Sequence, residues 1–187
     1  MKTNSFYKKI NKESPRTGNR NAYLMIEVVF FLITVISLSS LVLPKIIFEA
    51  KATDLGNATN YLAQNTITAI NNFKAKDSRY NGTTDSITGD NVIDYTPPNV
   101  ESSGKIDNYW VLYATNKKAL LFGFQAQTIN KFDFKLDYSK YCSDSSECGR
   151  LGKLLALKIT RYCLNSDFSV DTVNADTGTI LIENCQI

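Results

Sequence analysis

Four cysteines have the clearest chemistry in this 187-residue chain, and all of them fall in its last quarter. They are Cys142, Cys148, Cys163 and Cys185. An even number of cysteines beyond a membrane-type segment is typical of disulfides formed in an oxidising compartment. A four-cysteine zinc site is the competing interpretation, but neither spacing matches the paired CxxC pattern of a zinc ribbon. The sequence alone permits three disulfide pairings.

Residues that could support catalysis are scarce. The chain has no histidine, which removes the commonest general base and the commonest metal ligand. It also has no glycine-rich phosphate loop and no paired nucleophile and base. We therefore expect no enzymatic activity, no cofactor and no metal site.

Glu27 is the single charge in the apolar run YLMIEVVFFLITVISLSSLVLP, which extends from Tyr23 to Pro44. At about 1.5 Å per residue, a helix of this length approaches the roughly 30 Å of a bilayer's hydrocarbon core. An ionised carboxylate inside hydrocarbon is costly unless it is paired. The run therefore predicts a helix that spans or anchors in a membrane and carries one acid that needs a partner.

A cleaved secretory signal peptide and a plain signal anchor are the alternatives for this run. Secretory apolar regions are usually shorter, about 7 to 15 residues, and end in a small-x-small site near a turn. The small residues Ser37 to Ser40 lie in the middle of the run instead, so the signal-peptide interpretation is the weaker one.

Positive charge is concentrated at the N-terminus. Residues 1–22 hold six basic residues against Glu13, a net charge of +5, whereas the whole chain carries +3. A basic flank just before an apolar run is typical of the cytoplasmic side of a membrane segment. Because Pro15 and Gly18 interrupt this polar stretch, we expect a processed or disordered leader.

Beyond Pro44 the apolar residues follow a helical period. They recur at intervals of seven in two series, Phe48, Leu55, Leu62 and Ala69, and Ala52, Thr59, Thr66 and Phe73. This pattern predicts that the helix continues to about residue 74 with one buried face. Pro44 should kink it, because proline lacks a backbone donor and crowds the preceding turn.

The remainder of the chain predicts a loop followed by strands. Residues 75–107 are rich in Gly, Pro, Asn, Asp, Ser and Thr and predict a long connecting loop. Five strands are expected after it, in YWVLYAT from 109, ALLFGFQAQT from 119, KFDFKLDY (131–138), LLALKITRY (154–162) and TILIEN (179–184). In KFDFKLDY the apolar residues alternate, which places them on one face.

These elements define an α+β fold class, a long, kinked N-terminal α-helix packed on an antiparallel β-sheet and preceded by a disordered basic leader. We expect three segments. They are a leader (1–22), a helix (23–74) with a hydrophobic half (23–44) and an amphipathic half (45–74), and an extracytoplasmic head (75–187).

The stretch YLMIEVVFFLITVISLSSLVLPK resembles the N-terminus of type IV pilins and pseudopilins. In that superfamily a basic leader is cut before an aromatic residue or Met, a glutamate follows four residues later, and a helix-kinking proline lies further along. If Tyr23 is the first mature residue, then Glu27 and Pro44 fall on the glutamate and proline positions. The family usually has glycine before the cut, where this chain has Ala22.

The resemblance implies roles for these residues. Prepilin peptidase would cleave between Ala22 and Tyr23, and Tyr23 would then be N-methylated. Glu27 would pair with the terminal amine of a neighbouring subunit and so set the register of a filament.

The resemblance also bears on the cysteines, because many type IV pilins close the last part of the sheet with a disulfide. We favour the sequential pairing, Cys142 with Cys148 and Cys163 with Cys185. The second bond encloses 21 residues and is worth roughly 3 kcal/mol in the chain-entropy model.

As a function, the resemblance implies a structural subunit of a type IV pilus-like filament, serving adhesion, twitching motility or DNA uptake. The alternatives are a pseudopilin of a type II secretion system and an uncleaved, membrane-anchored periplasmic binding protein. The subunit would sit in the inner membrane, with its N-terminus cytoplasmic, before it enters a surface pilus or a periplasmic pseudopilus.

The implied partners are other pilin subunits, prepilin peptidase, the pilus or secretion assembly machinery and membrane lipid. DNA is a further candidate, since five lysines, Lys117, Lys118, Lys131, Lys135 and Lys140, lie near aromatic strands. The head's net negative charge argues against a dominant electrostatic footprint for DNA.

Overall fold

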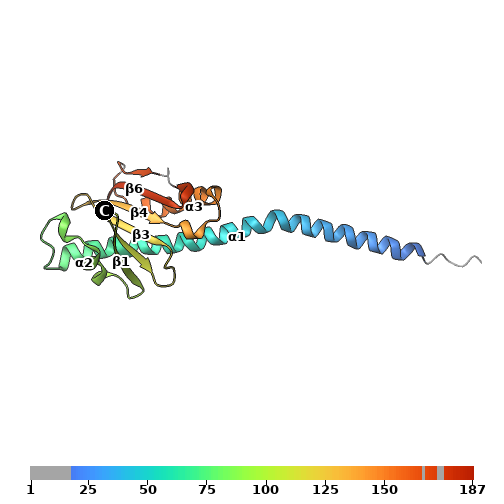
Figure 1. Cartoon of the computed structure of the whole chain (residues 1–187), viewed down its shortest axis with the longest axis horizontal. Helices are drawn as coiled ribbons and strands as arrows, with labels where there is room; N and C mark the ends of the chain where they lie inside the picture. The colour runs from blue at the N-terminus through green and yellow to red at the C-terminus, as the bar shows by residue number, and fades with distance from the viewer. Residues whose placement is uncertain (1–17, 166, 172–174) are drawn as a thin grey trace, which may run out of the picture. The chain divides into compact units, whose positions relative to one another are not determined.

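The computed structural model describes residues 18–165, 167–171 and 175–187 (Figure 1). The chain divides into two compact units, Met1–Ile47 and Phe48–Ile187. The leader predicted for residues 1–22 lies outside the described residues up to residue 17, and the helix begins at Gly18 rather than at Tyr23. The predicted α+β class is confirmed, with a long N-terminal helix and an antiparallel sheet.

Helix α1 (Gly18–Lys76) is 59 residues long and contains Pro44 in its interior. Its end agrees with the predicted boundary near residue 74. In the second unit its predicted stripe is buried: Leu62, Ala69 and Phe73 have no exposed surface, and Leu55 is nearly as well covered. The helix persists there because this stripe packs against the head.

In the described part of the chain, six strands form a single sheet in the order β1-β2-β3-β4-β6-β5, and every neighbouring pair is antiparallel. The strands are β1 (Val100–Ile106), β2 (Tyr109–Ala114), β3 (Leu121–Ala126), β4 (Lys131–Asp137), β5 (Ser169–Asp171) and β6 (Thr179–Gln186). The first four form a meander of consecutive hairpins, of which the sequence predicted β2, β3 and β4. Strand β6 pairs with β4, so the C-terminal segment completes the sheet that the meander begins.

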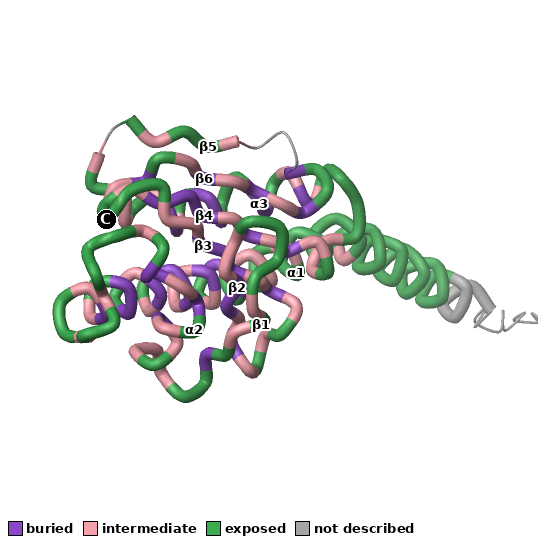
Figure 2. The backbone as a smooth tube through the Cα atoms, turned by 60° about the vertical axis from the view of Figure 1, so that its left-hand side comes forward, coloured by how far each residue is buried: buried purple, intermediate pink, exposed green. Residues whose placement is uncertain are grey.

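The core of the second unit lies between α1 and one face of this sheet. The alternating residues predicted to share a face in β4 are all fully buried, namely Phe132, Phe134, Leu136 and the following Tyr138. The ring of Phe122 in β3 stacks on Phe134 with 5.4 Å between centroids. Figure 2 shows this buried layer in purple along the central strands and the adjoining turns of α1.

The predicted strand at 154–162 is wrong, because residues 154–160 belong to helix α3 (Ser145–Thr160) and the next two form a turn. Its buried positions, Cys148, Leu151, Gly152, Leu155, Ala156 and Ile159, follow a helical period of three and four. Asp144 caps the helix by accepting a 2.8 Å hydrogen bond from the Glu147 amide. The predicted segment begins at Leu154, so it leaves out the capping residue Asp144 and the first three buried positions of the helix.

The predicted loop at 75–107 is only partly correct. It contains short helices, η1 (Thr84–Ser86), α2 (Gly89–Val92) and η2 (Ile93–Tyr95), and it ends in the edge strand β1. The sequence of β1, VESSGKI, has few strand-favouring residues. It forms because the turn at Asp107, which has a φ of 54°, folds it back onto β2.

Two further short helices complete the head, η3 (Ser139–Tyr141) and η4 (Ala175–Thr177). Gly178 follows η4 with a φ of 85°, in the turn that the sequence predicted before the last strand. A Cβ on Gly178 would come within 2.3 Å of the Ser139 backbone, so this close approach requires glycine.

Candidate assembly interface

The first unit presents a helix whose apolar side chains are exposed on every side. Between residues 23 and 47 the exposed large hydrophobic residues are Tyr23, Leu24, Met25, Ile26, Val28, Val29, Phe30, Phe31, Leu32, Ile33, Val35, Ile36, Leu38, Leu41, Val42, Leu43, Ile46 and Ile47. We call this segment, residues 23–47, the apolar half of α1. A helix that is hydrophobic all round is stable only inside lipid or other protein.

The apolar half also meets the length and composition of a membrane span near the N-terminus. The structure therefore fits the coarser part of the predicted location, attachment to a membrane by one helix.

Glu27 is exposed on the apolar half, one turn after Tyr23, whose side chain is 71% exposed. Within the described part of the chain no cation forms an ion pair with Glu27. Moving an unpaired carboxylate into an apolar environment costs several kcal/mol, about the effective penalty per buried ion. Glu27 therefore needs a cation from outside these residues wherever the apolar half is covered.

Three hydroxyls of the apolar half are satisfied within the helix. The hydroxyl of Thr34 donates to the Phe30 carbonyl at 2.8 Å, and that of Ser37 donates to the Ile33 carbonyl at 2.7 Å. The Ser40 hydroxyl donates to the Ser37 carbonyl at 2.8 Å. These bonds let small polar residues lie in an apolar surface at little cost.

The remaining predicted residues of this region lie on the same helix. Ala22 and Tyr23 are consecutive residues of α1, and Pro44 lies inside it. Since Pro44 has no N–H, the Ser40 carbonyl lacks its usual helical donor there. The cleavage, methylation and assembly roles assigned to these residues stay predictions.

The head is closed by two disulfides, Cys142–Cys148 and Cys163–Cys185. This is the sequential pairing that we favoured. The first links the segment after η3 to the first turn of α3, and the second links the segment after α3 to β6. Together they fasten both ends of α3 to the rest of the head.

Ionic and hydrogen-bond contacts fix the start of α3 beside α1. The Lys51 ammonium lies 2.7 Å from the Glu147 carboxylate, which also accepts a 2.7 Å hydrogen bond from the Ser143 amide. These contacts, the Lys51 bond first, lower the pKa of Glu147. Glu147 thus serves both the helix cap and the packing of α3 against α1.

A buried tyrosine ties β4 to the segments around α3. The Tyr138 hydroxyl lies 3.0 Å from both the Cys148 carbonyl and the Ala175 carbonyl. Burial raises the pKa of Tyr138 to about 12. A Cβ on Gly152 would come within 2.3 Å of this hydroxyl, so glycine is required where α3 crosses Tyr138.

A second cluster secures the C-terminal end of α1. The Arg79 guanidinium pairs with Asp77 at 2.5 Å and with Asp94 at 2.7 Å. The Tyr95 hydroxyl donates to Asp77 at 3.0 Å. Hydrogen bonds from Arg79 hold the pKa of the Asp77 carboxyl well below its usual range.

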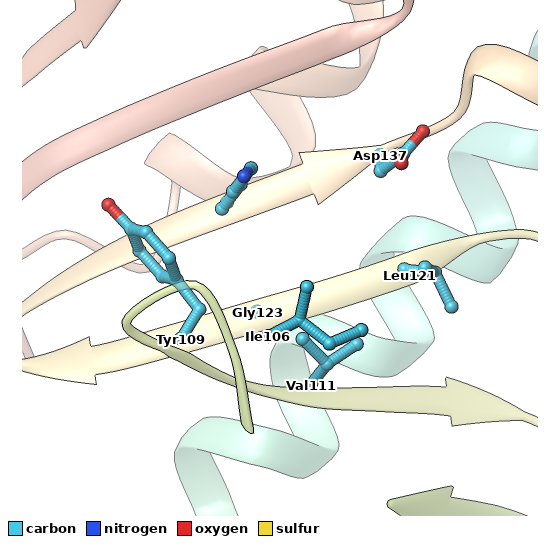
Figure 3. Close-up of a pocket in the computed structure, with 7 residues that line it drawn as sticks. Ile106, Tyr109, Val111, Leu121, Gly123 and Asp137 are labelled. Carbon is cyan, nitrogen blue, oxygen red and sulfur yellow. The ribbon is translucent and has the colours of Figure 1, made fainter. Parts of the chain in front are cut away.

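The sheet face opposite α1 has a small hollow of about 50 Å³. Figure 3 shows Tyr109 at one end of it and Asp137 at the other, with Ile106 and Val111 between them. The Tyr109 Cβ lies 3.0 Å from the place that a Cβ on Gly123 would take. The hollow has room for a few waters only, so this face does not provide a ligand pocket of ordinary size.

Two of the five lysines considered for DNA binding form ion pairs. Lys117 lies 2.5 Å from Asp54, and Lys135 lies 2.9 Å from Asp107. These carboxylates offset the positive charge that DNA would require. Among the described residues, no group of three or more His, Cys, Asp or Glu side chains is arranged to hold a metal ion.

The contacts of Lys51 and Arg79 and the packing of α3 were missed by sequence reasoning. The one available signal was Asp144 with Glu147 three residues later, which is the spacing of a capping box. No family model, curated protein or solved structure matches this chain.

Proposed function

We propose that the protein is a structural subunit of a type IV pilus-like filament, held in a membrane before assembly. The observation that carries this proposal is the all-round exposure of the apolar half of α1 together with its single acid, Glu27. A plain anchor needs no such acid, because a charge inside the bilayer opposes insertion.

The proposal gives each part of the apolar half a role. Membrane lipid covers it before assembly, and the same segments of neighbouring subunits cover it in the filament. Cleavage after Ala22 creates an amine at Tyr23, and this amine of a neighbouring subunit supplies the cation that Glu27 lacks among the described residues. The disulfide-closed head remains outside the membrane throughout.

Replacing Glu27 tests the proposal directly. Glu27→Ala and Glu27→Gln should leave the subunit in the membrane and processed but should reduce the amount in sheared surface filaments by at least about tenfold, which corresponds to 1.4 kcal/mol. Asp90→Ala, which removes an exposed acid from the head, is the matched control and should assemble normally. Filaments at wild-type level from both Glu27 variants would overturn the proposal.

The same variants separate the filament from a secretion pseudopilus. A pseudopilus subunit should show loss of protein secretion in the Glu27→Ala strain while surface pili remain intact. Wild-type filaments that contain this protein in sheared material favour the pilus.

A further inference from the structure

A hollow of about 230 Å³ opens in the head where the segment of η1 and α2 meets the hairpin of β1 and β2. Helix α2 lies against both of these strands (Figure 2). Three apolar residues line the hollow, Ile87, Ala126 and Trp110, which is the only tryptophan of the chain. We call this site the Trp110 hollow. The proposed function assigns no role to it.

The Trp110 ring is held in position by the chain itself. A Cβ on Gly89 in α2 would come within 2.9 Å of the ring, so the helix packs directly against the indole. The Lys105 ammonium lies 5.8 Å from the ring centroid, and this lysine is exposed. A cation–π contact at an exposed site is weak. A ligand can therefore displace Lys105 and contact an indole that needs no further ordering.

Polar side chains of the Trp110 hollow are unpartnered in the described part of the chain. Asp85 and Lys105 form no ion pair there, either with each other or with another residue. The side-chain amides of Asn108 and Gln125, which also line the hollow, form no hydrogen bond there. One carboxylate, one ammonium and two amides are thus available to a ligand.

The chemistry of these groups narrows the class of ligand. Asp85 and Lys105 are the one acid and the one base of the lining, so the site has no net charge and favours neither DNA nor a cation. The carboxylate accepts hydrogen bonds, the ammonium donates them, and the amides do both. The hydroxyls of Thr84 and Thr88 also line the hollow. This mixture suits a neutral ligand that carries several hydroxyl groups.

The apolar part and the size of the hollow point to the same class. An aromatic ring offers a flat apolar surface, which fits the C–H face of a sugar ring. At roughly 30 Å³ per liquid water, the volume corresponds to about seven waters. One sugar ring fits such a space, whereas a drug-sized ligand needs a larger one.

We propose that the Trp110 hollow binds a neutral sugar ring, a hexose or an N-acetylhexosamine. The C–H face of the sugar packs on Trp110, and its hydroxyls form hydrogen bonds with Asp85, Asn108 and Gln125. The site lies wholly within the head, so the proposal goes beyond the proposed function and holds whether or not the chain assembles. In a filament, many copies of the hollow bind a glycan-covered surface together.

Tryptophan fluorescence tests the proposal, because the single tryptophan reports on this site without a label. The full-length chain, in a detergent without a sugar head group, is titrated with lactose, mannotriose and chitotriose. At least one of these sugars should give a saturable change in the emission of Trp110. A thymidine oligonucleotide and the zwitterion glycine betaine should give none. No change with any of the three sugars, or a change with only the oligonucleotide or betaine, would overturn the proposal.

Substitutions on the rim locate the bound sugar. Asp85→Ala and Asn108→Ala alter exposed side chains and should each raise the Kd by about tenfold, the effect of 1.4 kcal/mol. Asp90→Ala and Asn116→Ala, which alter an exposed acid and an exposed amide outside the hollow, are the matched controls and should leave the Kd unchanged. An unchanged Kd in both rim variants would show that the sugar binds elsewhere and would refute the site. Loss of filaments in the Glu27 variants has no bearing on this result, so the two proposals fail separately.

Discussion

The two halves of α1 differ in what covers them. Between Phe48 and Lys76 the helix buries one stripe against its own sheet, and polar residues face outward. Between Tyr23 and Ile47 it exposes apolar side chains on all sides. The later half of the helix is therefore covered by its own head, whereas the earlier half needs lipid or another protein to cover it.

The difference also separates the residues that stabilise the head from the residues that we propose for assembly. Residues that pack within the head contribute to its free energy of unfolding, because unfolding exposes them. Residues of the apolar half are exposed in both states of an isolated chain and contribute little to that free energy. Substitutions in the two halves should thus affect different measurements.

A matched pair of phenylalanine substitutions gives the largest expected contrast. Phe134→Ala in β4 removes a ring with no exposed surface and should lower the free energy of unfolding of the head by about 3–5 kcal/mol. Phe30→Ala, at a ring that is 67% exposed, should change it by less than about 0.5 kcal/mol. Urea unfolding of the detergent-solubilised chain, followed by circular dichroism, measures both. Equal losses would contradict the division between the halves.

Removing the second disulfide should have the next largest effect. The double variant Cys163→Ser and Cys185→Ser opens a link with a sequence separation of 22 and should lower the free energy of unfolding by roughly 3 kcal/mol. The corresponding change at Cys142 and Cys148, with a separation of 6, should cost less, because the loop is shorter. The unfolding midpoints of the two double variants are compared. A larger loss of stability from opening Cys142–Cys148 than from opening Cys163–Cys185 would contradict the chain-entropy account.

Acid should weaken the end of α1. Because the pKa of Asp77 is lower in the folded state, this group stabilises the head fully above the ordinary carboxyl range, about pH 4, and the contribution is lost as the pH falls below it. Glu147, whose pKa is also lowered, contributes with the same sign. Thermal unfolding between pH 7 and pH 2 should show a shallower decline for Asp77→Asn than for wild type. Parallel curves would show that Asp77 makes no such contribution.

Two buried threonines give the smallest expected effect. The hydroxyls of Thr59 and Thr66 are buried in the stripe of α1 and have no hydrogen-bond partner among the residues that the structure describes. Replacing either by valine keeps the shape and removes an unsatisfied group, so Thr59→Val and Thr66→Val should each raise the free energy of unfolding by about 1 kcal/mol. Serine at the same sites should lower it, since the hydroxyl stays and a methyl group is lost. Destabilisation by both valine variants would contradict the absence of a partner.

The elements with a strong local period were predictable from the sequence. The stripe from Phe48 to Phe73 specified α1, and the alternation in KFDFKLDY specified the buried face of β4. Strand β1 was not predictable, because its serines and Gly104 have little intrinsic preference for a strand and its pairing depends on the turn at Asp107. Helix α3 was mistaken for a strand because a short apolar run, taken without the N-cap residue Asp144, fits a helix as well as a strand.

The candidate interface was predictable to a different degree in each part. Glu27 and Pro44 stand out in an apolar run, so the sequence alone marks them. The position of α3 next to α1 was not predictable, because it requires long-range contacts such as Lys51 with Glu147. No local pattern encodes a pair that is 96 residues apart.

The central claim is that residues 23–47 act as an assembly surface whose N-terminus is created by cleavage. N-terminal sequencing of the protein recovered from sheared cell-surface filaments tests it most directly. The account predicts a mature chain that begins with N-methylated Tyr23. A chain that keeps its leader and remains only in the membrane fraction would contradict the account.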